Sequence, residues 1–381
     1  MQLIIKLGVC ILNALYFILK LTISTKDKVL LISRQSNEPS IDFILLKNSI
    51  ITKYPDVEVK ILCHTLDGGL HSSIFTKIHY GIHMLKQMKE MSSSKVVVLD
   101  TYCMVASLLK HKRTLKIIQM WHSIGTMKKF GYTALDTEEG TNKKIAYTMH
   151  MHDQYSYVLA SSSAYKSDLA LGFNCSEDII KVMPLPRLDL LHDKIYKVKK
   201  REEIFALYPL LSKKTVIVYA PTFRKNENEM QNALDRLTES LYENQILVLK
   251  LHPLSKLHVK NDKVLIAEEF STFDMLFVAN ALISDYSCVI YEAASLDIPL
   301  YFYNFDMNNY IGKRGLAIDY EHELPGVISK NPYDITTAIA KQKYDFDYLK
   351  KFCNKYVNYN GQASDTIADF IYSIMRDEVS M

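Results

Sequence analysis

The stretch "SIFTKIHYGIHMLKQMKEMSSSKVVVLD", from Ser73 to Asp100, decides the fold class. Its first part repeats apolar residues at helical spacing, and its last part is a short run of valine and leucine typical of a buried strand. A helix followed at once by a buried strand is the repeating element of a parallel α/β sheet. The stretch therefore predicts an α/β fold if other strands alternate with helices in the same way.

Other apolar runs of strand length do alternate with helical patterns in both halves of the chain. The predicted strands, besides 95–100, are 29–33, 57–63, 115–120, 215–220, 246–251, 263–267, 281–285 and 299–303. Ser271 is expected to cap a helix over 271–280, because Asp274 follows three residues later. The charged, helical segment 191–214 separates the halves. We therefore expect two doubly wound, Rossmann-like domains with a ligand in the cleft that they face.

Composition excludes several classes of protein. The chain has 381 residues, 48% hydrophobic and 23% charged, which is typical of a globular protein. Its 46 basic and 42 acidic residues give a net charge of +4, too small to indicate a nucleic-acid binder. Six scattered cysteines without a CxxC pair indicate a reducing environment and no zinc site. The missing GxGxxG and GxxxxGK[ST] motifs disfavour a dinucleotide dehydrogenase and a P-loop ATPase.

The N-terminal segment is almost wholly apolar from Leu3 to Ile23, but Lys6, Asn13 and Lys20 interrupt it at a spacing of seven. This spacing places the three polar residues on one face of a helix. The apolar run between the lysines is shorter than the roughly 20 residues that a spanning helix needs. We expect a helix over 1–25 that lies in the membrane interface. A tilted spanning anchor, a signal peptide and a buried core helix are the alternatives.

Polar residues directly follow several predicted strands, where parallel α/β folds bind their ligands. His122 follows one strand, Thr222 and Arg224 another, and His252 a third, and Asp285 and Ser287 stand at the end of a fourth. The basic and hydroxyl side chains suit phosphate, and no cluster of carboxylates indicates a metal. This set predicts a phosphate-binding site.

His122 lies in "IIQMWHSIGTMKKFGY", from Ile117 to Tyr132, beside the only tryptophan of the chain. An isolated histidine is often a hydrogen-bonded core residue. Here Gly125 permits close approach of a backbone, and Lys128 and Lys129 supply charge for a phosphate. The alternative is a general base, because imidazole titrates closest to neutral pH.

The remaining candidates also have two interpretations each. Arg224 in "APTFRK" is either a bidentate phosphate ligand or a surface arginine, and His252 is a phosphate donor or a cap of its strand. Asp285 to Ser287 are expected to open a helix whose N–H groups bind an anion. Glu292 binds a hydroxylated group such as a ribose or is a solvated helix acid.

In "PLPRLDLL", Arg187 and Asp189 stand two residues apart. A salt bridge between them within the segment that connects the two domains is the structural alternative to a ligand contact.

Six motifs together resemble the CDP-glycerol glycerophosphotransferases of teichoic acid synthesis. They are "QMWHSIGTMKKFGY", "PLPRLDLL", "VIVYAPTFR", "LVLKLHPL", "LISDYSCVIYEAASLDIPLYFYNFDMNNYIGKRG" and "ELPGVI", over residues 117–328. The resemblance implies a GT-B-like enzyme with an acceptor-side domain over 26–195 and a CDP-donor domain over 205–375. It also implies peripheral attachment to the cytoplasmic face of a bacterial membrane and no cofactor beyond the CDP-polyol donor.

The activity implied is transfer of a polyol phosphate to a hydroxyl of a polyprenyl-linked acceptor, with release of CMP. By the resemblance, His122 is the base that deprotonates this hydroxyl. The residues implied to contact the donor pyrophosphate or polyol phosphate are Arg187, Thr222, Arg224, His252 and Ser287, with Asp285, Asp306, Arg314 and Glu292 on the donor side. From the residues themselves, Gly125, Lys128 and Lys129 are expected to contact the acceptor or a phosphate. The family's second serine after Asp-Tyr-Ser is Cys288 here, which weakens any phosphate contact at that position.

The donor and the number of units added stay open at this point. CDP-ribitol differs from CDP-glycerol only by a longer polyol. A nucleotide-sugar glycosyltransferase of the same fold and a non-catalytic binding module are the alternatives from other classes. Partners expected are the CDP-polyol, the lipid-linked acceptor and the inner membrane leaflet, with no nucleic acid and an open oligomeric state.

Overall fold

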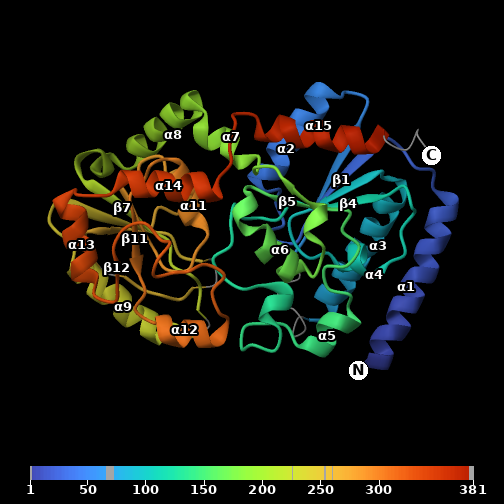
Figure 1. The fold of residues 1–381 in the computed structure, drawn as a ribbon, viewed down its shortest axis with the longest axis horizontal. Helices are drawn as coiled ribbons and strands as arrows, with labels where there is room; N and C mark the ends of the chain where they lie inside the picture. The colour runs from blue at the N-terminus through green and yellow to red at the C-terminus, as the bar shows by residue number, and fades with distance from the viewer. Residues whose placement is uncertain (1, 66–72, 225, 253–254, 260, 377–381) are drawn as a thin grey trace. The chain divides into compact units, whose positions relative to one another are not determined.

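The computed structural model describes residues 2–65, 73–224, 226–252, 255–259 and 261–376 (Figure 1). The chain forms two compact units. Unit 1 comprises Met1–His122, Phe130–Asp189 and Asn358–Met381, and unit 2 comprises Ser123–Lys129 and Leu190–Val357. The chain therefore passes between the units more than once, and one of these passages separates His122 from Ser123.

Unit 1 contains a parallel six-stranded sheet in the order β2-β1-β3-β4-β5-β6. The strands are β1 (Lys28–Ser33), β2 (Glu58–Cys63), β3 (Val96–Leu99), β4 (Lys116–Gln119), β5 (Tyr157–Ala160) and β6 (Ile180–Val182). All residues of β1 and β3 are buried, as expected for strands that helices cover on both faces. The order reverses between β1 and β3, so this is a topological switch point.

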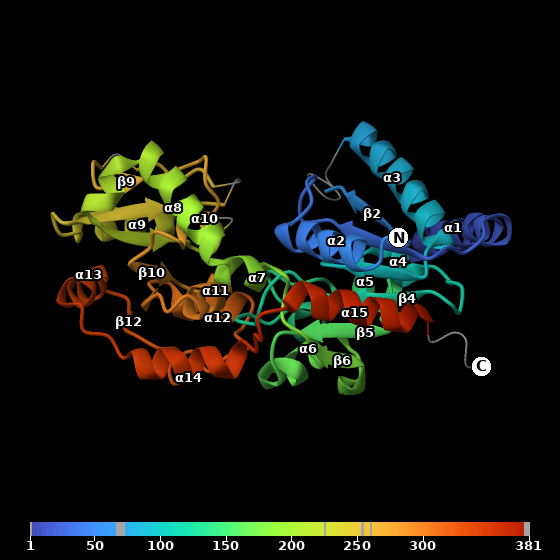
Figure 2. The same ribbon diagram turned by 90° about the horizontal axis from the view of Figure 1, so that it is seen from above.

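Most helices of unit 1 lie between its strands along the chain. The helices are α1 (Gln2–Thr22), α2 (Ile41–Lys53), α3 (Ile74–Ser93), α4 (Met104–Leu108), α5 (Lys143–Thr148), α6 (Lys166–Phe173) and α15 (Ala363–Arg376), and α7 (Arg187–His192) starts in this unit. Ser40 caps α2, Ser73 caps α3 and Asn142 caps α5. Helix α15 packs on α2, so the C-terminal segment returns to the sheet where the chain began (Figures 1 and 2).

Unit 2 contains a second parallel six-stranded sheet, in the order β12-β11-β10-β7-β8-β9. Its strands are β7 (Thr215–Tyr219), β8 (Gln245–Leu249), β9 (Val264–Leu265), β10 (Ala281–Ser284), β11 (Leu300–Tyr303) and β12 (Ile328–Ser329). Its helices are α8 (Lys194–Leu207), α9 (Asn228–Glu239), α10 (Thr272–Met275), α11 (Val289–Ser295), α12 (Met307–Lys313), α13 (Pro332–Lys341) and α14 (Phe346–Tyr356). Read from β9, this is the Rossmann strand order with its switch point between β7 and β10.

The expected α/β fold with parallel sheets is confirmed. Strands β5, β6 and β12 had not been predicted, because each is short and its sequence lacks a long apolar run. Ser271 and Asp274 form the expected capping box, but the helix that they open, α10, ends at Met275 instead of continuing to 280. The boundaries 1–25, 26–195 and 205–375 stay predictions.

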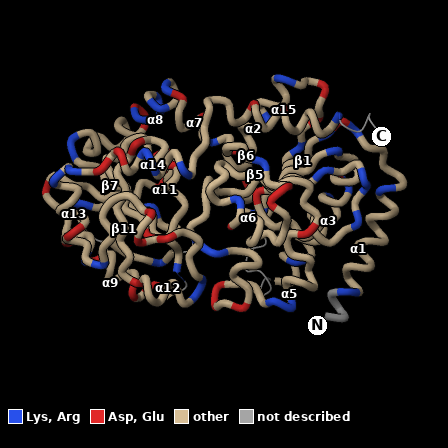
Figure 3. The backbone as a smooth tube through the Cα atoms, viewed as in Figure 1, with Lys and Arg blue, Asp and Glu red and all other residues tan. Residues whose placement is uncertain are grey.

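The polar residues of helix α1 face the rest of unit 1. The side chain of Asn13 bonds the carbonyl of Leu108 (3.3 Å) and accepts the N–H of Lys110 (2.9 Å), and Lys20 donates to the Lys110 carbonyl. Tyr16, only 1% exposed, bonds His111 at 3.0 Å. Figure 3 shows α1 mostly in tan, the colour of uncharged residues. Among the helices that the structure describes, none is both long and apolar enough to cross a membrane.

Candidate active site

The predicted site residues of unit 1 lie at the carboxyl ends of neighbouring strands. His122 follows β4, Asp100 follows β3, and Asp42 stands in the first turn of α2, the helix after β1. Parallel strands bring all of these ends to one edge of the sheet, and ligands of open α/β sheets bind at that edge beside the switch point. His122 and Arg187 are the two predicted site residues that unit 1 contains.

The His122 imidazole is oriented by the backbone of Asp100. Its Nδ1 lies 3.0 Å from the Asp100 carbonyl oxygen, and because a carbonyl can only accept, Nδ1 carries the proton of the neutral ring. The lone pair of that tautomer is on Nε2. A histidine held in this way can accept a proton from a hydroxyl, which is what a general base must do.

The backbone before His122 is in an unusual conformation. Trp121 has φ of 67°, a left-handed value that a bulky side chain rarely adopts. Its N–H donates to the side chain of Gln119 (3.0 Å), and the fully buried Gln119 amide donates in turn to Tyr155 (3.0 Å). The indole packs against His122, Phe130 and Phe173. A buried polar residue and an aromatic cluster thus hold the strained turn that presents His122.

Arg187 is anchored by Asp42 and supports the same turn. Its Nε lies 2.9 Å from Asp42 Oδ2, its backbone N–H donates to Asp42 Oδ1 (2.8 Å), and its Nη2 donates to the His122 carbonyl (3.0 Å). The Asp42 side chain is 2% exposed. Arg187 therefore connects the start of α2 with the backbone of His122, in addition to any ligand that it binds.

The alternative of a salt bridge between Arg187 and Asp189 is wrong, because the Asp189 carboxylate binds other groups. It accepts the N–H groups of Ala363 (2.8 Å) and Ser364 (2.7 Å) and the hydroxyl of Tyr359 (3.1 Å). Asp189 thus stabilises the N-terminus of α15, where a negative charge is favourable.

In unit 2 the predicted site residues gather around Arg224. Its Nε and Nη2 donate to the two oxygens of Asp306 (2.6 and 2.9 Å), and its Nη1 donates to Asp285 (2.8 Å) and to the Thr222 carbonyl. These bonds use four of the five N–H donors of a guanidinium. Burial acts to lower the pKa of Arg224, but Asp285 and Asp306 outweigh it and raise the pKa above its ordinary value.

Asp285 connects the loops after β7 and β10, the two strands at the switch point. It is fully buried and accepts the N–H of Thr222 (3.0 Å), the Thr222 hydroxyl (2.8 Å) and the Arg224 guanidinium. The prediction that residues 285–287 open a helix is wrong, since α11 begins at Val289 with Cys288 as its N-cap. The carboxylate of Asp285 sits at the edge of the sheet and fixes the "PTFR" loop.

An aromatic frame surrounds the guanidinium of Arg224. The rings of Tyr286 and Tyr310 stack at 4.0 Å, and Arg224 lies 5.7 and 5.6 Å from their centroids. The ammonium of Lys128 lies 5.9 Å from the Tyr310 ring. Stacked rings and paired charges leave Arg224 with little freedom, and its side chain is 8% exposed.

The glycine of the Trp-His motif is used for packing within unit 2. A Cβ on Gly125 would lie 2.6 Å from two ring atoms of Tyr291, whose hydroxyl donates to the Thr126 carbonyl (2.8 Å). The thiol of Cys288 lies 3.4 Å from the Gly125 carbonyl. The close approach that Gly125 permits is thus to Tyr291. Cys288, which replaces the second serine of the resembling family, contacts the same segment.

The remaining predicted residues differ in exposure. His252 is exposed, with its ring 4.9 Å from that of Phe223, and the following Pro253 lies outside the described residues. Ser287 and Arg314 are half-buried, and Arg314 donates to the carbonyl of the exposed Lys129 (3.0 Å). Glu292 is 6% exposed, so the alternative of a solvated helix acid is wrong.

Sequence reasoning missed Asp42, Asp100 and Tyr310. Burial raises the pKa of Asp100 to about 6, and its Oδ2 has no hydrogen-bond partner among the described residues. The only signal for Asp100 was its place as the last residue of a predicted strand. No sequence pattern indicated Asp42 or Tyr310, because each acts through a partner far away in the sequence.

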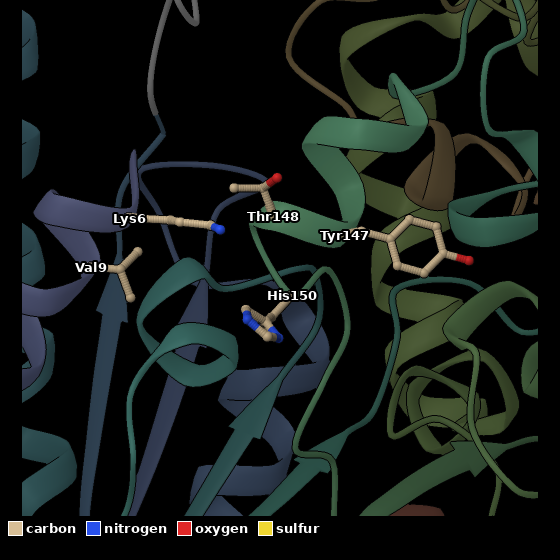
Figure 4. A pocket seen from close by; sticks show the side chains of 5 residues that line it. All are labelled: Lys6, Val9, Tyr147, Thr148 and His150. Carbon is tan, nitrogen blue, oxygen red and sulfur yellow. The ribbon is translucent and has the colours of Figure 1, made fainter. Parts of the chain in front are cut away.

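A separate cavity of about 340 Å³ lies between α1 and the α5 region (Figure 4). Lys6, Val9, Tyr147, Thr148 and His150 line it, and the Lys6 side chain extends from α1 toward α5. None of the predicted site residues contributes to this cavity.

Two Rossmann-like units with basic side chains at the carboxyl ends of their strands are typical of enzymes that bind phosphorylated ligands. A family model described as "CDP-Glycerol:Poly(glycerophosphate) glycerophosphotransferase" matches residues 14–373. The chain belongs to this family, and it is an enzyme of the teichoic acid polyol phosphate transferase group.

Named relatives include transferases for both polyols. The chain is 27% identical over 361 residues to a teichoic acid ribitol-phosphate primase of Bacillus spizizenii, covering 92% of each chain. It is 29% identical over 304 residues to a teichoic acid glycerol-phosphate primase of Bacillus subtilis, covering 77% of each. A solved structure of the wall teichoic acid polymerase TagF aligns with a TM-score of 0.75 at 19% identity, over 100% of this chain and 99% of that one. The fold is therefore shared with a polymerase.

Proposed function

We propose that this enzyme transfers glycerol phosphate from CDP-glycerol to a hydroxyl of a polyprenyl-linked saccharide or teichoic acid acceptor and releases CMP. The observation that carries the proposal is the orientation of His122, whose Nδ1 is bound by the Asp100 carbonyl in a chain of this family. The lone pair on Nε2 then accepts the proton of the acceptor hydroxyl as its oxygen attacks the β-phosphorus. The bond from this phosphorus to the bridging oxygen breaks, and CMP leaves as a phosphate anion.

The polar and charged residues have two kinds of role in this proposal. His252, Ser287 and Arg314 contact the phosphates of the donor, because their side chains are exposed or half-buried. Arg224 and Thr222 act mainly through Asp285 and Asp306, and they position the loops that bind the donor. Positioned donors of this kind stabilise the charge of a phosphoryl-transfer transition state without further covalent chemistry.

Arg187, Glu292 and the lysines complete the proposed assignment. Arg187 holds the His122 backbone and keeps the base in place, while Lys128 and Lys129 supply charge to a phosphate of the donor or acceptor. Glu292, buried in α11, is assigned to the cytidine side of the donor.

The test of the base is the release of CMP from CDP-glycerol in the presence of a lipid-linked disaccharide. His122→Ala is expected to lower the rate by about 10²–10⁴. The matched control is His322→Ala, an exposed histidine of unit 2 paired with Asp319. Turnover that survives His122→Ala unchanged would reject the assignment and favour a binding module.

CDP-ribitol is the second candidate donor, because a ribitol-phosphate primase is 27% identical over 92% of the chain. Incubation of the enzyme and acceptor with each donor in turn, followed by mass measurement of the product, decides between them. A mass increase with neither donor, combined with release of UDP from a UDP-sugar, would instead identify a glycosyltransferase.

We also propose that the enzyme works at the inner face of the membrane, attached through α1. With Asn13, Tyr16 and Lys20 bound to unit 1, the large apolar residues of α1 point outward: Leu7, Ile11, Leu15, Phe17, Ile18 and Leu21 are 43–70% exposed. Helix α1 contains no acidic residue and ends near Lys20, which suits an anionic lipid surface.

Sedimentation with anionic vesicles tests this attachment. The triple change Leu7→Ser, Ile11→Ser and Ile18→Ser is expected to leave most of the protein in the supernatant. The control changes Ile195→Ser and Val198→Ser, at residues of α8 that are 82% and 56% exposed, and should sediment like the unchanged protein. Equal sedimentation of the α1 variant would show that another surface binds the vesicles.

A further inference from the structure

Three histidines of unit 1 gather away from His122. His64 directly follows β2, and His79 and His83 stand one turn apart on α3, so they lie on one face of that helix. The ring centroid of His64 is 5.2 Å from that of His79 and 4.9 Å from that of His83. His79 is exposed and the other two are half-buried, so a ligand can reach the cluster. We call these three residues the histidine cluster.

The surroundings of the histidine cluster are mainly basic. The pKa of His83 falls to about 4, first because of burial and then because of His64, Lys86 and His79. Arg34 lies 5.6 Å from the ring of Tyr80, on which His64 also stacks. The buried Nε of Arg34 has no hydrogen-bond partner among the residues described.

Acidic groups near this corner of unit 1 are Glu38 and the buried Asp100, both of which act on Cys63. An excess of donors over carboxylates favours an anion as ligand. A metal is a poorer fit, because within the described ranges no three His, Cys, Asp or Glu side chains could hold one ion.

Helix α3 presents an apolar face to solvent beside the histidines. Its exposed large residues are Ile74 (65%), Phe75 (80%), Ile78 (55%), Ile82 (59%) and Leu85 (45%). Their spacing of three and four places them along one stripe, and Ile78 and Ile82 directly precede His79 and His83. The same helix packs beside α1, whose outward face is also apolar. A ligand that carries both a phosphate and a hydrocarbon chain fits such a surface.

The histidine cluster also lies at the edge of the sheet that carries His122. In the order β2-β1-β3-β4, the strand before His64 is separated from the strand before His122 by two others. At about 4.8 Å between neighbouring strands, the two strand ends are roughly 14 Å apart. A short saccharide between a lipid phosphate and the reacting hydroxyl would span this separation.

We propose that the histidine cluster binds the phosphate or diphosphate of the lipid-linked acceptor, while the apolar stripe of α3 contacts the lipid chain. This inference rests on the proposed function, since it names the subsite for the acceptor of that reaction. It accounts for imidazoles at a distance from the base and for an apolar stripe on a helix other than α1.

The direct test is binding of farnesyl diphosphate to the full chain and to the variant His79→Gln/His83→Gln. Loss of two charge-assisted hydrogen bonds is expected to weaken binding about tenfold or more. His322→Gln serves as the control and should bind like the unchanged protein. Inorganic diphosphate and farnesol, each tested alone, should bind more weakly than the molecule that combines them.

Three results would overturn the proposal. One is farnesyl diphosphate binding that the double variant leaves unchanged. Another is a loss confined to phosphatidylglycerol vesicles, which would assign the cluster to bulk headgroups. The third is Zn²⁺ binding that the double variant abolishes while farnesyl diphosphate binding persists.

Kinetics separates this proposal from the proposed function. In the CMP-release assay the double variant should raise KM for the lipid-linked acceptor about tenfold and leave KM for the donor unchanged. If no CDP-polyol supports CMP release, the proposed function fails, while farnesyl diphosphate binding still reports on the histidine cluster.

Discussion

Asp306 binds Arg224 through both carboxylate oxygens, at 2.6 Å from Nε and 2.9 Å from Nη2. The pair is nearly fully buried, with side-chain exposures of 7% and 8%. A buried guanidinium with four of its five donors in use serves first to fix the loops after β7 and β11. Breaking the pair should therefore lower the stability of the protein.

Asp306→Asn is expected to destabilise the protein by about 3 kcal/mol, because it leaves part of a buried positive charge uncompensated. Urea unfolding followed by circular dichroism measures the change. Glu243→Gln, which removes the exposed partner of Lys263, is the control and should leave the midpoint unchanged. An equal midpoint for Asp306→Asn would mean that the ion pair does not hold unit 2 together.

Gly125→Ala is expected to destabilise unit 2 by about 1–3 kcal/mol, because the new methyl group would lie 2.6 Å from the ring of Tyr291. The ring cannot easily move away, since its hydroxyl is bound to the Thr126 carbonyl. Gly312→Ala in α12 is the matched control, because its added Cβ would meet no atom within 4 Å apart from its chain neighbours and the nearby backbone of its own helix. Thermal unfolding of both variants measures the difference, and similar midpoints would contradict the packing role.

Asp100 gives the stability of the protein a definite dependence on pH. Burial raises its pKa to about 6 from an unfolded value of 3.8, so the folded state binds the proton more tightly. This contribution is complete below pH 4 and is lost as the pH rises through 6, at a cost of about 3 kcal/mol.

Asp100→Asn should remove this dependence. The difference in unfolding free energy between the variant and the unchanged protein is expected to shift in favour of the variant between pH 4.5 and 7, values chosen to lie on either side of about 6. Urea titrations at the two pH values measure it. Parallel behaviour of the two proteins would show that Asp100 is not the group that titrates.

Tyr16→Phe is expected to weaken the attachment of α1 to the rest of unit 1. The tyrosine hydroxyl bonds Nδ1 of His111, whose Nε2 faces the Ala106 carbonyl at 2.7 Å, so the hydroxyl is the donor. Removing it leaves a buried acceptor unsatisfied and costs about 1 kcal/mol. Hydrogen exchange should increase in α1 but not in α15, and Tyr147→Phe on the exposed surface of α5 is the control. Unchanged exchange in α1 would contradict this.

Much of the fold could be predicted because buried parallel strands are apolar runs. The runs that became β1, β3, β7 and β8 are each four or more residues of mainly valine, isoleucine and leucine. Strand β6 has only three residues, Ile180–Val182, and it pairs with β5. Such a strand exists because its neighbour provides hydrogen bonds, and no local pattern indicates that neighbour.

The sequence predicted where the candidate residues stand relative to the strands, but not which partners they contact. Placement after strands found His122, Arg224 and Asp285 from sequence alone. The partners were not predictable, because Asp42 and Arg187 are 145 residues apart and Arg224 and Asp306 are 82 apart. Sequence position shows that a charge stands at a sheet edge, whereas only the folded chain shows which opposite charge it meets.

The strained Trp121 turn has a practical consequence. This residue is the only tryptophan of the chain, and its ring centroid lies 4.1 Å from that of His122. All of the indole fluorescence of the protein therefore comes from one ring in contact with the candidate base. A charged imidazole quenches a neighbouring indole, so the emission intensity can report a change in the charge of His122 without any label.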